Sequence, residues 1–278
     1  MYLKIKDINV YYEEIGNGIP VIMLHGYTPD HRLMSGCMES VFEKMNGNYR
    51  RIYFDLPGMG KTKVTDSVRN SDDMLNIVIE FIEETVKEEK FILVGESYGG
   101  YLARGVTLRK REQILGISLI CPLIVPDNES RDLPEKIVLD RDEQMLESLN
   151  RKEKYMLDLS GSAVYSRKVW EDFRKNILPA LEIVDRKFIN EFSANGYSFS
   201  FDVDDVEKPY EFPGLFLAGR QDSVVGYRDM WNVLENYPRA SFIVLDKAGH
   251  NIQSEQNELF EETMKEWFTR IDDYSGKF

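Results

Sequence analysis

The sequence predicts an α/β fold in which a mostly parallel sheet is flanked by helices and carries a helical insertion. Three observations lead to this prediction. Short apolar segments typical of buried strands alternate with amphipathic, helix-like segments up to about residue 123. The sequence is then charged, with helical spacing of its apolar residues, as far as residue 210, and the alternation resumes at Pro213. We therefore expect a core of residues 1–123 and 211–278, and a cap of residues 124–210 over the carboxyl ends of the strands, where open α/β sheets bind ligands.

Each segment outside the insertion has its own local signal. Alternating apolar and polar residues predict a hairpin, apolar runs predict strands, and apolar stripes predict helices. The expected strands are a hairpin over 2–15 and single strands at 19–24, 51–55, 91–94, 114–121, 215–218 and 241–245. The expected helices lie at 31–45, from the capping residues 70–73 to about 86, after Ser97, and at 227–236 and 254–270.

The insertion has little β-type patterning. Helices are expected there at 134–150, 151–159, 166–181 and 185–194.

Composition excludes several classes of partner. The chain has 278 residues and a formal charge of −13, and no cluster of Lys and Arg offsets that charge, which argues against nucleic acid or an anionic membrane as a ligand. No apolar run approaches the roughly 18 residues of a membrane span. Cys37 and Cys121 have apolar neighbours and are expected to be reduced core residues. Together these features predict a cytoplasmic protein. We also expect a small-molecule substrate and a monomer or homodimer, although composition decides neither.

The strand at 91–94 runs directly into Gly95-Glu96-Ser97-Tyr98-Gly99 and then into a helix. This G-x-S-x-G pattern places a serine on a turn so tight that only glycine fits two residues before and after it. The hydroxyl then stands clear of the sheet, beside the N-terminus of the following helix. Ser97 is therefore the predicted nucleophile.

A serine nucleophile needs a base, and the base needs a group that orients it. Of the three histidines, His250 follows the last predicted strand and is the predicted base, whereas His25 is expected to support a neighbouring loop. Asp222 closes the segment Gly219-Arg220-Gln221-Asp222 that follows the strand at 215–218. It is the predicted orienting acid, with Asp127 as its rival. The order serine, acid, histidine is the order that this strand–turn–helix arrangement requires.

Two backbone N–H groups are expected to stabilise an oxyanion, those of Tyr98 and Tyr27. Tyr27, Tyr98 and Trp170 are also the predicted substrate contacts. Other cap aromatics, Tyr155, Tyr165 and Phe173, could line the same pocket or pack the cap onto the sheet. No metal and no organic cofactor are expected, because the histidines lack ligand spacing and no dinucleotide-binding pattern is present.

With these motifs in place, the sequence resembles the α/β-hydrolase family with a helical cap, over essentially the whole chain. His25-Gly26-Tyr27 is similar to the oxyanion motif of that family, and Asp55 to Gly60 resembles its D-x-P-G-x-G turn. Gly95 to Gly99, Gly219 to Asp222 and Gly249-His250 resemble its nucleophile, acid and base positions. The resemblance implies an eight-stranded, mostly parallel sheet and a serine hydrolase.

The expected reaction is cleavage of a small carboxyl ester or related acyl compound through an acyl-enzyme. A proline iminopeptidase-like aminopeptidase and a carbon–carbon bond hydrolase are alternatives on the same three residues. Epoxide hydrolases and haloalkane dehalogenases are disfavoured, because those members carry aspartate where this chain has Ser97. A different class of protein, a ligand-binding protein on a hydrolase scaffold without turnover, remains the other hypothesis.

Overall fold

The computed structural model describes residues 1–276, and its centre is one eight-stranded sheet. The first three strands in spatial order pair antiparallel, and all later pairs are parallel. The spatial order is β1 (Tyr2–Ile5), β2 (Ile8–Ile15), β4 (Tyr49–Phe54), β3 (Ile19–Leu24), β5 (Phe91–Glu96), β6 (Ile114–Ile120), β9 (Gly214–Gly219) and β10 (Ala240–Leu245). The mostly parallel, eight-stranded sheet expected from the sequence is confirmed.

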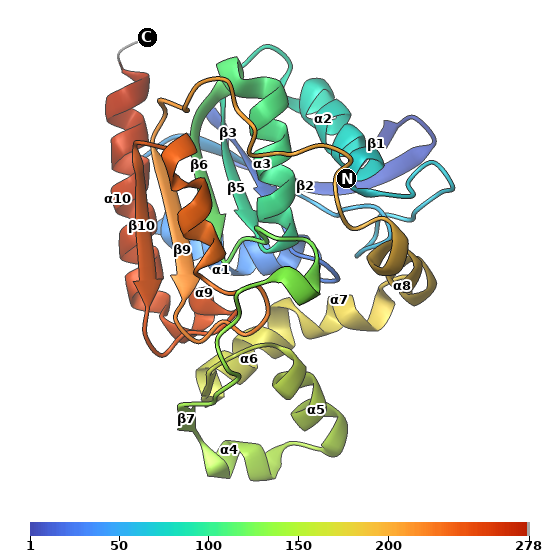
Figure 1. Cartoon of the computed structure of the whole chain (residues 1–278), viewed down its shortest axis with the longest axis vertical. Helices are drawn as coiled ribbons and strands as arrows, with labels where there is room; N and C mark the ends of the chain where they lie inside the picture. The colour runs from blue at the N-terminus through green and yellow to red at the C-terminus, as the bar shows by residue number, and fades with distance from the viewer. Residues whose placement is uncertain (277–278) are drawn as a thin grey trace.

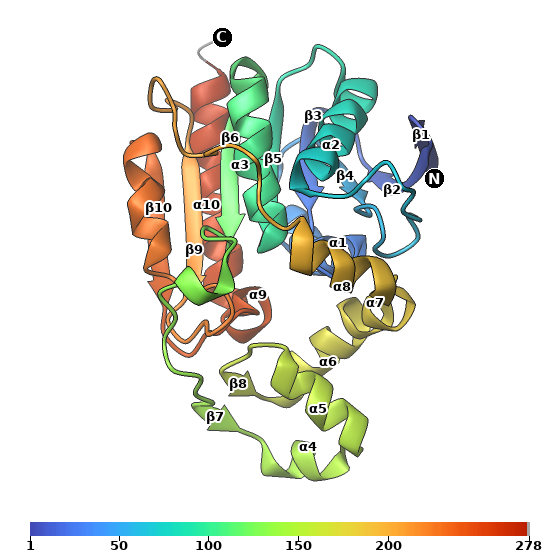
Figure 2. The same ribbon diagram turned by 45° about the vertical axis from the view of Figure 1, so that its right-hand side comes forward.

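Helices cover both faces of the sheet. On one face lie α2 (Ser71–Val86) and α3 (Tyr98–Lys110), and on the other α1 (His31–Glu43) and α10 (Asn257–Ser275) (Figures 1 and 2). Each helix buries an apolar stripe, for example Phe81 of α2 and Trp267 of α10, both fully buried. This double cover explains why β3, β5, β6 and β9 consist almost wholly of buried residues.

Between β6 and β9 the chain forms a separate group of short elements, residues 140–195, which we call the cap from here on. The outermost part holds α4 (Glu143–Ser148), α5 (Arg151–Leu159) and a two-stranded sheet of β7 (Asp140–Arg141) and β8 (Val164–Tyr165). Three further helices, α6 (Arg167–Asn176), α7 (Leu178–Ile183) and α8 (Arg186–Asn195), lie between this part and the core (Figure 2). The remaining short elements are η1 (Arg111–Gln113), η2 (Asn128–Ser130), η3 (Asp229–Asn236) and α9 (Ile252–Glu255).

The expectation of one helix over 134–150 is wrong. The chain is extended up to β7, because the Leu139 N–H donates to the Ala163 carbonyl at 2.8 Å and the Asp142 N–H to the Tyr165 carbonyl at 2.8 Å. Asp142 then caps α4 by accepting the N–H of Met145. Pairing with a distant strand thus overrides the local helical spacing, and only the last turns become helical.

The expected helix at 166–181 is divided into α6 and α7. Pro179 lacks the N–H that an unbroken helix would need at this point, and it occupies the first turn of α7, where that N–H is not required. The expected helix at 227–236 is a 3-10 helix, η3.

The last residues of the predicted cap lie on the core instead. Phe199 stacks on Tyr101 of α3 with ring centroids 4.1 Å apart, and its N–H donates to the Tyr101 hydroxyl. Arg104, also in α3 and 1% exposed, pairs with Asp204 at 2.6 Å.

None of the helices in residues 1–276 combines the length and apolar character that crossing a membrane requires.

Candidate active site

Ser97 lies at the junction of β5 and α3, in the turn that the sequence predicts. Its backbone has a φ of 53° and a ψ of −118°, a conformation that residues with side chains rarely adopt. The flanking glycines make the turn sterically possible. A Cβ on Gly95 would lie 2.4 Å from the Gly99 carbonyl oxygen, and one on Gly99 would lie 2.3 Å from the Leu24 carbonyl oxygen. The serine is consequently held at the carboxyl end of the sheet.

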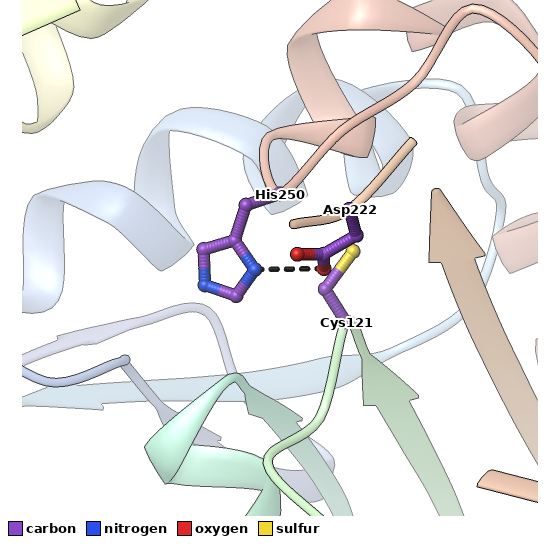
Figure 3. A group of neighbouring side chains, drawn as sticks. All are labelled: Cys121, Asp222 and His250. Carbon is purple, nitrogen blue, oxygen red and sulfur yellow. Dashed lines mark hydrogen bonds and ion pairs between the residues drawn. The ribbon is translucent and has the colours of Figure 1, made fainter. Parts of the chain in front are cut away.

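Ser97, His250 and Asp222 come together in one hydrogen-bonded row. His250 Nε2 lies 3.0 Å from Ser97 Oγ, and His250 Nδ1 lies 2.9 Å from Asp222 Oδ2. Figure 3 shows the second contact, between groups carried by two different loops. Asp222 is fully buried, and its other oxygen accepts the N–H groups of Val224 and Val225. The carboxylate is therefore fixed on the side of the imidazole away from Ser97.

Asp127, the rival acid, does not reach this row. It is exposed and bonds the Ser130 hydroxyl and the Glu129 N–H, which makes it a cap for η2.

The electrostatics of the row favour a charged imidazole. Burial by itself would lower the pKa of His250, but the charge and hydrogen bond of Asp222, with Glu96 and Glu255 farther away, raise it to about 9. In the charged imidazole both ring nitrogens donate, Nδ1 to Asp222 and Nε2 towards Ser97 Oγ. Once the Nε2 proton is lost, Nδ1 keeps its proton towards Asp222 and Nε2 becomes the acceptor that faces the serine hydroxyl.

Glu96 is an ionisable group at this site that motif reasoning did not assign a role. It precedes Ser97, is 4% exposed, and its Oε1 lies 3.5 Å from His250 Nε2. Burial raises the pKa of its carboxyl to about 7, although His250 acts in the opposite direction. Its place next to Ser97 in the sequence is the one available signal, but that place alone does not indicate the contact with His250.

The second such group is Glu255, in α9, which joins the His250 loop to the cap. One carboxylate oxygen accepts the N–H groups of Gly249 and Asn251, on either side of His250. The other accepts the N–H groups of Ala163 and Val164, at the start of β8. No sequence motif indicates this arrangement, because the donors are backbone groups from segments about 90 residues apart.

Further bonds strengthen the same junction, which we call the 160–164 seam after its cap residues. The His250 N–H donates to the Gly161 carbonyl at 2.9 Å, and the Asn251 amide donates to the Ser160 carbonyl at 2.7 Å. Gly161 has a φ of 73°, and a Cβ there would lie 3.0 Å from the Cβ of His250. The base thus sits on a loop held by cap residues as well as by the core.

The loop that carries Tyr27 lies beside the turn that carries Ser97. A Cβ on Gly26 would be 3.1 Å from Ser97 Cβ, so this backbone passes directly next to the serine. His25 holds the loop in place: its Nδ1 donates to the Gly26 carbonyl at 2.8 Å and its Nε2 accepts the Leu56 N–H at 2.9 Å. With both ring nitrogens so used, His25 has the supporting position expected from the sequence.

A cavity of about 510 Å³ opens onto Ser97 and His250 from beneath the cap. Its aromatic lining consists of Tyr27, Tyr155, Phe173 and Tyr197. Two of the predicted substrate contacts, the side chains of Tyr98 and Trp170, do not line this cavity. The Tyr98 side chain is fully buried and its hydroxyl bonds that of Ser71, and Trp170 is buried against Phe173, so neither is among the lining residues. Tyr165 likewise lies outside the lining and contacts Asp158.

Two clusters in the described chain each bring the potential ligand atoms of three residues within 4.8 Å of one another: Cys121, Asp222 and His250, drawn in Figure 3, and Asp30, His31 and Asp55. In both clusters, hydrogen bonds between the residues or to the backbone explain why the side chains lie so close together. Cys121 Sγ faces the Gly249 carbonyl while Asp222 and His250 bond each other, and His31 Nδ1 bonds Asp55 Oδ1 at 2.6 Å.

Comparison with known proteins agrees with this architecture. A sequence model of the family described as alpha/beta hydrolase fold matches residues 19–256. A pimeloyl-(acyl-carrier protein) methyl ester esterase of Legionella pneumophila (strain Corby) is 22% identical over 268 residues, covering 94% of this chain and 99% of the relative. A 2-hydroxy-6-oxononadienedioate/2-hydroxy-6-oxononatrienedioate hydrolase of Paraburkholderia phymatum is 24% identical, covering 93% and 90%.

Among solved structures, an alpha/beta superfamily hydrolase from Oenococcus oeni PSU-1 superposes with a TM-score of 0.85 at 31% identity. The superposition covers 98% of this chain and 99% of that chain. The family match, the sheet order and the serine turn lead to one conclusion: the chain belongs to the α/β hydrolase fold family.

Proposed function

We propose that this protein is a serine hydrolase that cleaves a small carboxyl ester through an acyl-enzyme intermediate. The observation that carries the proposal is the row Asp222–His250–Ser97, with contacts of 2.9 Å and 3.0 Å, opening into a cavity of about 510 Å³. A nucleophile, its base and the orienter of that base are the groups that acyl transfer requires.

In the first half-reaction, Ser97 Oγ attacks the ester carbonyl carbon while His250 Nε2 takes the hydroxyl proton. The carbonyl π bond breaks and its electron pair moves to the oxygen, which the N–H groups of Tyr98 and Tyr27 stabilise as an oxyanion. Asp222 stabilises the imidazolium formed in this step. The tetrahedral intermediate then collapses, the bond to the alkoxy group breaks, and His250 returns its proton to the departing alcohol.

In the second half-reaction, a water molecule takes the place of the alcohol. His250 removes its proton as the water oxygen attacks the acyl carbon, and the same imidazole then protonates Ser97 Oγ as the acid product departs. The free hydroxyl and the neutral imidazole are restored. No other reactant is needed.

The names of the relatives support hydrolysis as the reaction class. Because one relative is named as an ester hydrolase and another as a hydrolase of an oxo-dienedioate, carbon–carbon bond hydrolysis is the second candidate. Aminopeptidase activity and ligand binding without turnover are further outcomes that an experiment must separate.

Covalent labelling with a fluorophosphonate tests the proposal. We expect the wild-type protein to be labelled at Ser97, and Ser97→Ala and His250→Ala to lose the label while keeping the same circular dichroism spectrum. A panel of p-nitrophenyl esters, amino-acid anilides and a vinylogous diketone then assigns the reaction, with the short esters expected to turn over fastest. A folded wild-type protein that takes no label and cleaves no substrate would contradict the proposal.

A further inference from the structure

The proposed mechanism uses one carboxylate on His250, but the structure places two there. Asp222 bonds Nδ1, and Glu96 Oε1 lies 3.5 Å from Nε2, the nitrogen that also faces Ser97 Oγ at 3.0 Å. At 3.5 Å the Glu96 contact is long for a hydrogen bond and short enough for a strong charge interaction. Glu96 and Ser97 therefore compete for the same face of the imidazole.

Glu96 is buried where the serine turn meets the Tyr27 loop, and its carboxyl accepts a hydrogen bond from the Gly26 backbone. The side chain is 4% exposed, lines the cavity beneath the cap, and packs its Oε2 against the backbone of Gly26. Within residues 1–276, its ion pair is with His250. A buried carboxyl is costly unless it is paired and hydrogen-bonded, and carboxyls that face a reacting group are commonly found where they act on the chemistry.

The surroundings of the pair contain several other titratable groups. Arg131 lines the same cavity and donates to the backbone carbonyls of Val125, Pro126 and Val224. The groups that influence Glu96 or His250 come from the acid loop, from α9, from the buried thiols and from the cavity wall: Asp222, Glu255, Cys37, Cys121 and Tyr197. Burial keeps both thiols and the phenol neutral over the working range, since it raises the pKa of each. The charges that act most strongly on the imidazole are thus those of Asp222, Glu96 and Glu255, while Arg131 interacts electrostatically with Asp222 and Tyr197.

We propose that Glu96 is a positioning residue for the imidazole charge: it shares a proton with His250 and sets the lower pH limit of the reaction. This inference rests on the proposed function. When Glu96 is ionised it holds the imidazole in its protonated form, which cannot accept the proton of Ser97. Once the pair has lost that proton, the ionised Glu96 instead stabilises the imidazolium that forms in the transition state.

The negative charge of Glu96 therefore has two opposite effects on activity. Removing it should let His250 become neutral at lower pH, so that activity begins at lower pH. It should also weaken the stabilisation of the imidazolium during attack, so that the activity plateau falls. Loss of a merely structural contact would lower the plateau and leave the pH limit where it was, which makes the pH profile the decisive readout.

The test compares Glu96→Gln with the wild type in a pH profile of kcat/KM on a p-nitrophenyl ester. An opposite charge this close shifts a pKa by about one unit or more. We expect the acid limb to move down by about one pH unit, and the plateau to fall by up to about tenfold, the factor that corresponds to one pKa unit. Glu258→Gln, in the exposed first turn of α10, removes the same charge from a residue that does not line the cavity and should change neither.

An active Glu96→Gln variant whose acid limb coincides with that of the wild type would overturn the inference. A direct titration decides the same question without turnover. In protein labelled with 13C and 15N histidine, the His250 signals, assigned with His250→Asn, should titrate at lower pH in Glu96→Gln than in wild type.

The inference also has a test that needs no Glu96 variant. In the wild-type protein, the 13C carboxyl signal of Glu96 and the ring signals of His250 should show a common inflection. Independent titration of the two groups would refute the shared proton. A wild-type protein that hydrolyses no ester but shows the common inflection would refute the proposed function and leave the Glu96–His250 coupling standing.

Discussion

Two aspartates follow neighbouring strands of the sheet, and the structure gives them different surroundings. Asp127 comes after β6, is exposed and caps a short helix, whereas Asp222 comes after β9, is fully buried and bonds His250 Nδ1. Only a carboxylate in the second position can hold the ring with Nε2 turned to the serine. The pair therefore offers a matched test of the orienting role.

We expect Asp222→Asn to lower kcat by roughly 10³- to 10⁴-fold, because the amide no longer fixes the imidazole tautomer or stabilises its charge. Asp127→Asn should retain nearly full activity. Steady-state kinetics on one ester measures both. Equal losses in the two variants, or a normal rate in Asp222→Asn, would mean that the row does not act as proposed.

The roles of single residues could be predicted where a motif fixes backbone geometry. Gly95, Ser97 and Gly99 specify their turn by sterics, so their placement follows from the sequence. Glu96 could not be assigned in this way, since its partner lies 154 residues later in the sequence, at His250, and only the folded sheet brings the two together.

At the scale of elements, the serine turn depends on close backbone contact between β3, β5 and α3. We expect Gly99→Ala to destabilise the protein by more than about 2 kcal/mol, because its Cβ would meet the Leu24 carbonyl oxygen at 2.3 Å and backbone cannot move aside cheaply. Gly276→Ala, where the nearest atom is 3.4 Å away and φ is −66°, should stay within about 0.5 kcal/mol.

Urea unfolding monitored by circular dichroism compares the two alanine variants. A Gly99→Ala midpoint equal to that of the wild type would show that the serine turn can accept a Cβ at position 99 without loss of stability, against the expectation.

Strands and helices of the core were predictable because their apolar periodicity agrees with their burial. The cap was harder, for two physical reasons visible in particular segments. Residues 134–142 have helical spacing but pair with the segment around β8, and Pro179 divides a continuous apolar stripe into α6 and α7. Non-local pairing and a missing N–H each outweigh a weak local preference.

At the scale of the whole molecule, the cap and the core meet at Glu255. We expect Glu255→Gln to lower kcat by about tenfold to a hundredfold with a smaller change in KM, because its amide nitrogen would face two N–H donors and displace the His250 loop. Glu258→Gln, three residues further on and exposed, is the control. A change confined to KM would indicate that Glu255 shapes the cavity and does not position the base.

The two cysteines report on the integrity of the whole fold. Cys37 and Cys121 are free and buried, and burial raises the pKa of both thiols. We expect a thiol reagent to react slowly with the native protein and to count two thiols after unfolding, with the same melting temperature with or without a reductant. Rapid reaction of the native protein would contradict the burial of both residues.

The 160–164 seam has a consequence for how such proteins diversify. The cap contributes the Gly161 carbonyl, which accepts the His250 N–H. A Cβ on Gly161 would lie 2.4 Å from Val224 Cγ2 and 3.0 Å from the His250 Cβ, so no larger residue fits there. A chimaera that transplants a foreign cap should therefore keep its turnover only when residues 160–164 of the recipient are retained. Cap residues outside 160–164 can then be exchanged to change the substrate preference, whereas residues 160–164 must stay those of the core that carries His250.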